Sequence, residues 1–347
     1  MKRSTILIVT TILFIAILGA ILINNSKSTP KQNIQIDSLK TISEQTDKQE
    51  FGYQDYAKNA IHNISELRRS KFSGSSLTIE SKLSAGSNFT SYIASYQSEG
   101  NKIYGLLTIP NETKSSKGFP AIVFMHGYIP PKEYSTTKNY TSYQAELASS
   151  GFVTYKPDLR GHGNSEGEPA SAHFSQKYVI DALYAINALK NYEKTDSNRL
   201  GYWGHSNGGE IGLRLAVITS QIKAYSLWAG VVGSFEDMLE TYIHKIPFLR
   251  KRDIKLINEH GLPSENPQFW NKIDPYNYLQ YVSAPIQLQH GTGDPSVPVE
   301  LSIRLRQELE KAGKTVELYK YKGDDHNISK NYNVAWQRTI EFFKNNL

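Results

Sequence analysis

The chain has 347 residues, of which 39% are hydrophobic and 21% charged, so it is long enough for one large globular domain with appendages. Lysine and arginine outnumber aspartate and glutamate by 39 to 33 without forming a run of five like charges. This pattern favours general surface charge over a nucleic-acid-binding surface, which needs clustered cations. Cysteine is absent, which excludes disulfides, thiolate nucleophiles, cysteine-based metal sites and a lipid-modified N-terminal cysteine.

Residues 1–23 predict a signal anchor or transmembrane helix. Lys2 and Arg3 precede an uncharged, mainly aliphatic run over residues 6–23. This run is longer than the apolar part of a usual signal peptide, about 7–15 residues, and reaches the about 17–25 of a membrane-spanning helix. The bulky Leu18 makes cleavage after Ala20 unfavourable. We therefore expect an uncleaved span with the catalytic part outside the cytoplasm, because basic flanks stay inside. Secretion after signal cleavage is the alternative.

Residues 24–76 are expected to form a polar tether with a short helix. Residues 24–49 are rich in Asn, Ser, Lys, Gln and Thr, a composition typical of a linker that holds a domain away from the bilayer. Between Tyr53 and Arg69, apolar residues recur at steps of three and four, which indicates a short amphipathic helix.

Residues 77–347 predict one α/β domain. Residues 89–96 and 102–109 flank a Glu99-Gly100-Asn101 turn, which indicates a β-hairpin. Further strands are expected at 121–125, 152–155, 200–203, 224–229, 286–289 and 316–319, and helices at 140–150, 174–192, 208–218, 299–312 and 334–345. Strands that alternate with helices of this length predict a mostly parallel sheet with helices on both faces.

The alternation breaks between Gly230 and about Tyr281, a segment that contains four prolines and Trp270. We expect this segment to be a small insertion that caps the carboxyl ends of the strands. In α/β folds, ligands bind at those ends.

Gly204-His205-Ser206-Asn207-Gly208 has the G-x-S-x-G pattern between a predicted strand and a predicted helix. In that context the pattern is typical of a strained turn that exposes a nucleophilic serine. Glycines are needed where side chains would clash as the backbone folds back, and the following helix directs its N–H groups and dipole at the developing anion. The sequence therefore predicts Ser206 as a nucleophile.

A serine hydroxyl needs a base that is oriented by an acid. After such a turn, the acid and then the histidine follow in the chain. Asp294 lies in the loop after the strand predicted at 286–289, and His326 is the only histidine after it. We predict His326 as the general base, with a surface loop histidine as the alternative. We predict Asp294 as the orienting acid, although it could instead be a helix-capping or turn aspartate ahead of Val299. Asp324 and Asp325 are rival acids that we expect to be solvated or to order their loop.

Two backbone N–H groups are expected to bind the oxyanion. One belongs to Asn207, directly after the nucleophile. The other belongs to Tyr128, in the His126-Gly127-Tyr128 loop after the strand predicted at 121–125. The Tyr128 hydroxyl either adds a hydrogen bond or lines the pocket. This chemistry requires no cofactor.

A second glycine-rich stretch covers residues 158–165 and contains Arg160, which is expected to pair with Asp158 or a neighbouring carboxylate. A phosphate-binding loop would need a Lys-Ser/Thr ending that is missing here. His126, His162 and His205 lack the spacing of a zinc site, so we expect them to order loops and predict no metal.

These motifs together resemble the catalytic domain of the prolyl oligopeptidase family, of the α/β-hydrolase superfamily. The resemblance covers about residues 77–345, and its motifs occur in the family's order: His126-Gly127-Tyr128, residues 158–165, residues 204–209, His290-Gly291-Thr292-Gly293-Asp294 with Val297-Pro298, and residues 323–326. It implies an α/β-hydrolase fold and a serine peptidase related to dipeptidyl and acylaminoacyl peptidases.

The chain departs from many of those peptidases in one respect. About fifty residues separate the predicted anchor from the hydrolase domain, too few for an N-terminal β-propeller. We therefore expect a peptidase acting on short peptides, with a carboxylesterase acting on small esters as the alternative. A non-catalytic membrane-anchored binding protein on a hydrolase scaffold is a hypothesis of another class.

Overall fold

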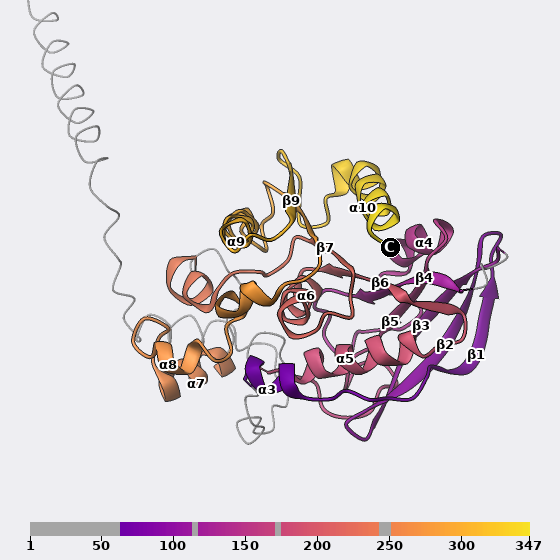
Figure 1. Cartoon of the computed structure of the whole chain (residues 1–347), viewed down its shortest axis with the longest axis horizontal. Coiled ribbons are helices and arrows are strands. Elements are labelled where there is room, and N and C mark those ends of the chain that lie inside the picture. The colour runs from indigo at the N-terminus through magenta and orange to yellow at the C-terminus, as the bar shows by residue number, and fades with distance from the viewer. Residues whose placement is uncertain (1–62, 113–116, 171–174, 243–250) are drawn as a thin grey trace, which may run out of the picture. The chain divides into compact units, whose positions relative to one another are not determined.

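The structure is a computed structural model that describes residues 63–112, 117–170, 175–242 and 251–347 (Figure 1). The predicted anchor at 6–23 and the polar stretch at 24–49 lie outside these residues. Within the described ranges, no helix combines the length and the apolarity that crossing a bilayer requires. The helix predicted within residues 53–69 is described only in part, as α3 (Ile64–Arg69).

The strands of the described residues form a single sheet in the order β1-β2-β3-β5-β4-β6-β7-β8-β9. Neighbouring strands from β5 across to β9 run parallel. The β1–β2, β2–β3 and β3–β5 pairs are antiparallel. The strands are β1 (Thr78–Ala85), β2 (Phe89–Ser98), β3 (Asn101–Pro110), β4 (Phe119–Met125), β5 (Val153–Pro157), β6 (Thr195–His205), β7 (Ala224–Trp228), β8 (Ile286–Gly291) and β9 (Val316–Tyr321). The prediction of a mostly parallel sheet is confirmed.

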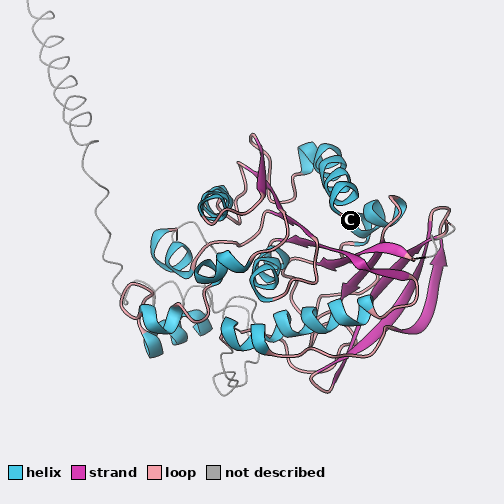
Figure 2. Ribbon diagram, in the orientation of Figure 1, coloured by secondary structure: helices cyan, strands magenta, loops and turns pink. Residues whose placement is uncertain are grey.

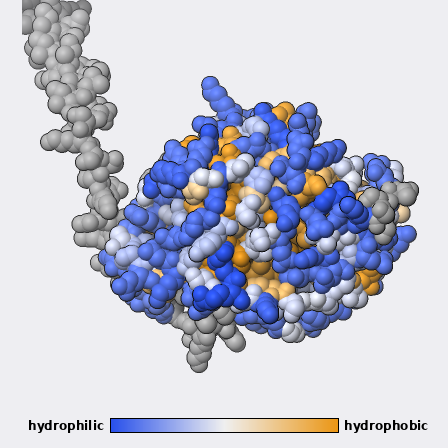
Figure 3. Space-filling view, viewed as in Figure 1, coloured by the Kyte–Doolittle hydropathy of each residue, from blue (hydrophilic) through white to orange (hydrophobic). Residues whose placement is uncertain are grey.

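Helices cover both faces of this sheet (Figure 2). They are α4 (Thr141–Ser149), α5 (Lys177–Lys190), α6 (Asn207–Ile218), α9 (Val299–Lys311) and α10 (Tyr332–Asn346). Alternate residues of a strand point to opposite faces. In β4, Ala121, Val123 and Met125 belong to the same apolar cluster as α5, α6 and α9, whereas Ile122 and Phe124 pack in the cluster that contains α4 and α10. The central strands are therefore apolar on both sides, and the surface in view is mostly hydrophilic (Figure 3).

Strand β1 was not predicted. All eight of its residues are exposed, including Ile79 and Leu83 at 40% and 43% exposure, so it has no apolar face that periodicity could reveal. It lies at the edge of the sheet and pairs with β2 through two register shifts. The hairpin predicted after it is confirmed as β2 and β3, which meet at Glu99 and Gly100.

Between β7 and β8, the described residues form helical pieces and no strand. These are a π-helical turn at Asp237–Thr241, α7 (Lys251–His260), α8 (Pro267–Trp270) and a 3₁₀ helix at Pro275–Tyr281. The segment is bound to its neighbours, because Ile64 N–H donates to Lys272 O and Arg214 of α6 donates to Ile273 O, each at 3.0 Å. Its predicted role as a cap over the site stays a prediction.

Candidate active site

Ser206 occupies a strained turn between β6 and α6. Its φ of 55° and ψ of −115° lie outside the regions that residues with a side chain normally adopt. The turn is held from the end of β7, because Ser206 N–H donates to Trp228 O at 2.9 Å and Ser206 O accepts from Val231 N–H at 3.2 Å. The strand–turn–helix context predicted for Ser206 is therefore present.

Glycines permit the close contacts around this turn. A Cβ on Gly204 would meet the backbone of Gly208, and a Cβ on Gly208 would meet the carbonyl of Met125 at the end of β4. A Cβ on Gly127, in the next loop, would meet the Tyr140 hydroxyl and lie 3.2 Å from the Ser206 Cβ. The loop after β4 and the Ser206 turn can therefore touch only because glycine occupies these positions.

Asp294 and His326 lie together in the loops after β8 and β9. His326 Nδ1 is 2.7 Å from Asp294 Oδ2. A carboxylate oxygen only accepts, so Nδ1 carries the proton and Nε2 is left as the basic nitrogen. Asp294 also orders its own loop, since its Oδ1 accepts from Ser296 N–H and Val297 N–H at 2.7 and 3.0 Å. Asp294 therefore orders a turn and contacts His326, but it does not cap α9, whose N-cap is Pro298.

The electrostatic surroundings keep Asp294 ionised. Burial alone would raise the pKa of its carboxyl, but hydrogen bonds from His290 and His326, and the charge on His326, hold that pKa well below its usual value. The Asp294 side chain is fully buried, whereas that of His326 is 19% exposed. His326 is thus oriented by a buried carboxylate and is itself partly accessible to solvent.

His205 joins the Ser206 turn to the His326 loop. Its Nε2 lies 2.9 Å from His326 O, and its Nδ1 lies 2.7 Å from the Tyr140 hydroxyl. Burial, together with the nearby His326, lowers the pKa of His205 to about 3, so His205 is neutral. Because a carbonyl only accepts, Nε2–H is the donor and Nδ1 accepts from Tyr140. The sequence predicts that His205 orders a loop, but it carries no signal for these two partners.

The residues predicted to bind an oxyanion belong to the start of α6 and to the loop after β4. Asn207 is the first residue of α6, and the leading N–H groups of a helix have no partner within it. Tyr128 follows Gly127, where an added Cβ would lie 3.2 Å from the Ser206 Cβ, and the Tyr128 side chain is 46% exposed.

The glycine-rich stretch at 158–165 forms a buried ionic network. Arg160 pairs with Asp181 of α5 at 2.6 Å and with Glu99 at 3.0 Å, so its partners are neighbouring carboxylates rather than Asp158. Asp158 accepts instead from the hydroxyls of Tyr134 and Thr136. These contacts link α5 to the β2–β3 turn.

Asp324, expected to be solvated or loop-ordering, is fully buried. Its carboxylate accepts from the N–H groups of Asp325, Lys330 and Asn331 and orders the His326 loop, so solvation was the wrong alternative. Within the described part of the chain, no three His, Cys, Asp or Glu side chains gather as metal ligands.

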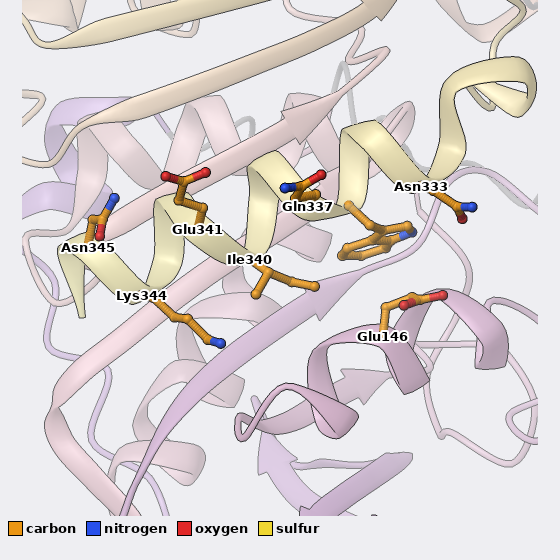
Figure 4. A pocket seen from close by; sticks show the side chains of 8 residues that line it. Glu146, Asn333, Gln337, Ile340, Glu341, Lys344 and Asn345 are labelled. Atoms are coloured by element: carbon orange, nitrogen blue, oxygen red, sulfur yellow. The ribbon is translucent and has the colours of Figure 1, made fainter.

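A separate groove of about 560 Å³ lies between α4 and α10 (Figure 4). Its lining residues are Glu146, Asn333, Trp336, Gln337, Ile340, Glu341, Lys344 and Asn345. None of the predicted catalytic side chains lines it.

The sequence model of the prolyl oligopeptidase family matches residues 138–347, more than half of the chain. The chain belongs to the prolyl oligopeptidase family.

Individual relatives include both peptidases and esterases. The chain is 28% identical to the uncharacterized peptidase YtmA of Bacillus subtilis over 68% of this chain and 85% of that protein. It is 27% identical to the esterase YjfP of Escherichia coli over 56% of this chain and 76% of that protein. An acetyl xylan esterase from Paenibacillus has a similar fold, with a TM-score of 0.63 at 18% identity, covering 87% of this chain and 98% of that one.

These findings confirm the α/β-hydrolase fold, and this family member is a serine hydrolase. Because its relatives include both peptidases and esterases, peptide and ester substrates are both plausible for this chain. The catalytic interpretation is therefore favoured over a non-catalytic binding protein.

Replacing Gly127 by alanine tests the contact between the loop after β4 and the Ser206 turn. We expect Gly127→Ala to lower kcat toward p-nitrophenyl acetate by roughly tenfold or more, because the new methyl group forces apart the Tyr140 hydroxyl and the turn. Tyr140→Phe removes the hydroxyl that the methyl group meets, so the double variant should recover part of the loss. Full activity of Gly127→Ala would contradict this account.

Proposed function

We propose that the protein hydrolyses acyl bonds through an acyl-enzyme on Ser206. The observation that carries this proposal is the Asp294–His326 hydrogen bond, joined through His205 to the strained turn that bears Ser206. An oriented histidine beside a serine on a strand–helix turn is the arrangement that makes a hydroxyl nucleophilic.

In the proposed reaction, Ser206 Oγ attacks the substrate carbonyl carbon while its proton passes to His326 Nε2. Asp294 stabilises the resulting imidazolium, and the N–H groups of Asn207 and Tyr128 stabilise the oxyanion. Collapse of the tetrahedral intermediate breaks the acyl bond as His326 gives its proton to the leaving group. Water then attacks the acyl-enzyme by the same steps, releasing the acid and free Ser206.

We propose short peptides as the substrate class. Membership of the prolyl oligopeptidase family and similarity to a protein named a peptidase over 85% of its length support this choice. Small esters are the second candidate, supported by similarity to an esterase over 76% of its length.

Replacing Ser206 by alanine should abolish turnover of p-nitrophenyl acetate and labelling by a fluorophosphonate probe, with an unchanged far-UV circular dichroism spectrum. Asp294→Asn should lower kcat roughly 10⁴-fold, because it favours the wrong tautomer of His326. The control is Ser264→Ala, an exposed serine in the segment between β7 and β8, which should leave both readouts unchanged. Labelling of the Ser206 variant would refute the assignment.

A substrate panel separates the two substrate classes. We expect aminoacyl- and dipeptidyl-naphthylamides to be cleaved, because protonated His326 can give its proton to an amine leaving group. Rates should be compared with those for acetyl and butyryl esters on the same enzyme preparation. Turnover confined to the esters would replace the peptidase proposal with the esterase one.

We also propose that residues 6–23 anchor the protein in a membrane with the catalytic domain outside the cytoplasm. The uncharged aliphatic run behind Lys2 and Arg3 supports this location. The full chain should sediment with membranes and resist extraction by high salt, whereas a variant lacking residues 1–23 should stay in the supernatant. Release of a shortened form to the medium would favour signal cleavage instead.

A further inference from the structure

His290 lies at the end of β8 with its side chain completely buried. Its Nε2 is 3.1 Å from Asp294 Oδ2 and 3.0 Å from Val297 O. On the other side of the ring, Nδ1 is 2.7 Å from Ser302 Oγ of α9. The ring therefore bridges a helix and the carboxylate that contacts His326.

The partners of His290 determine which ring nitrogen carries the proton. A carboxylate oxygen and a carbonyl oxygen only accept, so Nε2–H is the donor toward both Asp294 and Val297. The lone pair on Nδ1 then accepts from the Ser302 hydroxyl. The hydrogen bonds run in one direction, from Ser302 through His290 to Asp294.

Asp294 Oδ2 thus receives two N–H groups, one from His290 and one from His326. Its Oδ1 is already held by two backbone N–H groups of its own loop. These backbone hydrogen bonds fix Oδ1, but Oδ2 can still move when the carboxylate plane rotates. Of the two histidines that hold Oδ2, His290 is buried at the end of a strand, whereas His326 is partly exposed.

We propose that His290 is a positioning residue that holds Asp294 Oδ2 in line with His326 Nδ1 and sets the basicity of His326 through the shared oxygen. This inference rests on the proposed function of Ser206, Asp294 and His326. The positive end of the His290 N–H dipole draws negative charge away from Oδ2. Less charge then remains to stabilise the protonated form of His326.

Other titratable groups also face this pair. His205 approaches His326 from the end of β6, with ring centroids 4.6 Å apart, and Asp325 lies in the His326 loop within electrostatic range of Asp294. His205 donates to the backbone of His326, whereas His290 donates to Asp294 Oδ2 itself. The variants below leave both groups in place.

The test compares His290→Leu, which removes the donor, with His290→Gln, whose amide nitrogen reaches the place of Nε2. With p-nitrophenyl acetate, the leucine variant should lose roughly tenfold to a hundredfold in kcat while KM changes by less than about twofold. The acidic limb of its kcat/KM profile should move to higher pH, because Oδ2 regains charge that stabilises the imidazolium of His326. The glutamine variant should recover most of kcat and return the limb toward its original pH.

Ser302→Ala provides a milder change at a distance from Asp294. Loss of the hydroxyl weakens the polarisation of the ring, so the acidic limb should move in the same direction by a smaller amount. If the leucine variant fails to fold, the pH profiles of kcat/KM for the Ser302→Ala and His290→Gln variants test the positioning role instead.

An unmoved acidic limb in the leucine or serine variants, or a glutamine variant no better than leucine, would overturn the positioning role and leave His290 as a packing residue. Failure of the wild-type enzyme to turn over the ester and to be labelled at Ser206 would instead refute the proposed function. The first failure is measured on the variants and the second on the wild-type enzyme, so the two are distinguishable.

Discussion

The backbone of Ser206, at the end of β6, is held in its strained conformation by contacts from the ends of β4 and β7. A non-glycine residue at such φ and ψ values costs on the order of 1–3 kcal/mol, which the surrounding contacts must offset. Trp228 and Val231 bind the turn from the end of β7, and the carbonyl of Met125 fills the space beside Gly208. The parallel order of β4, β6 and β7 brings these ends together. The position of Ser206, the proposed nucleophile, therefore depends on the order of these strands in the sheet.

The histidine loop is bound to this turn from two directions. On one side, His205 donates to the backbone of His326, and its low pKa of about 3 keeps this bond unchanged across the neutral range. On the other side, Asp294 holds the imidazole and is itself held by its own loop and by His290. Asp324 fixes the loop backbone by accepting hydrogen bonds from three N–H groups. An enzyme that must protonate and deprotonate one ring gains from this fixed orientation.

Much of the fold could be predicted because its strands are apolar on both faces and separated by helices of ordinary length. β1 could not, because a strand exposed along its whole length carries no buried pattern. Ser206, Asp294 and His326 could be selected by motif and chain order, and the structure brings Asp294 and His326 together. The contacts of His205 with Tyr140 and of His290 with Ser302 could not be predicted, because they depend on three-dimensional packing rather than on a local sequence pattern.

Three of the chain's four tryptophans pack against one another, and one of them, Trp203, stacks on His205 beside Ser206. Ring centroids lie 5.4 Å apart for Trp203 and Trp336, 4.9 Å for Trp228 and Trp336, and 5.7 Å for Trp203 and Trp228. Indoles this close share their excited states, so they emit as a coupled group and give a strong near-ultraviolet dichroic signal. Trp270 lies apart from them, between β7 and β8. The protein thus carries an intrinsic optical reporter two residues from His205, one that records the packing beside the strained Ser206 turn without any label.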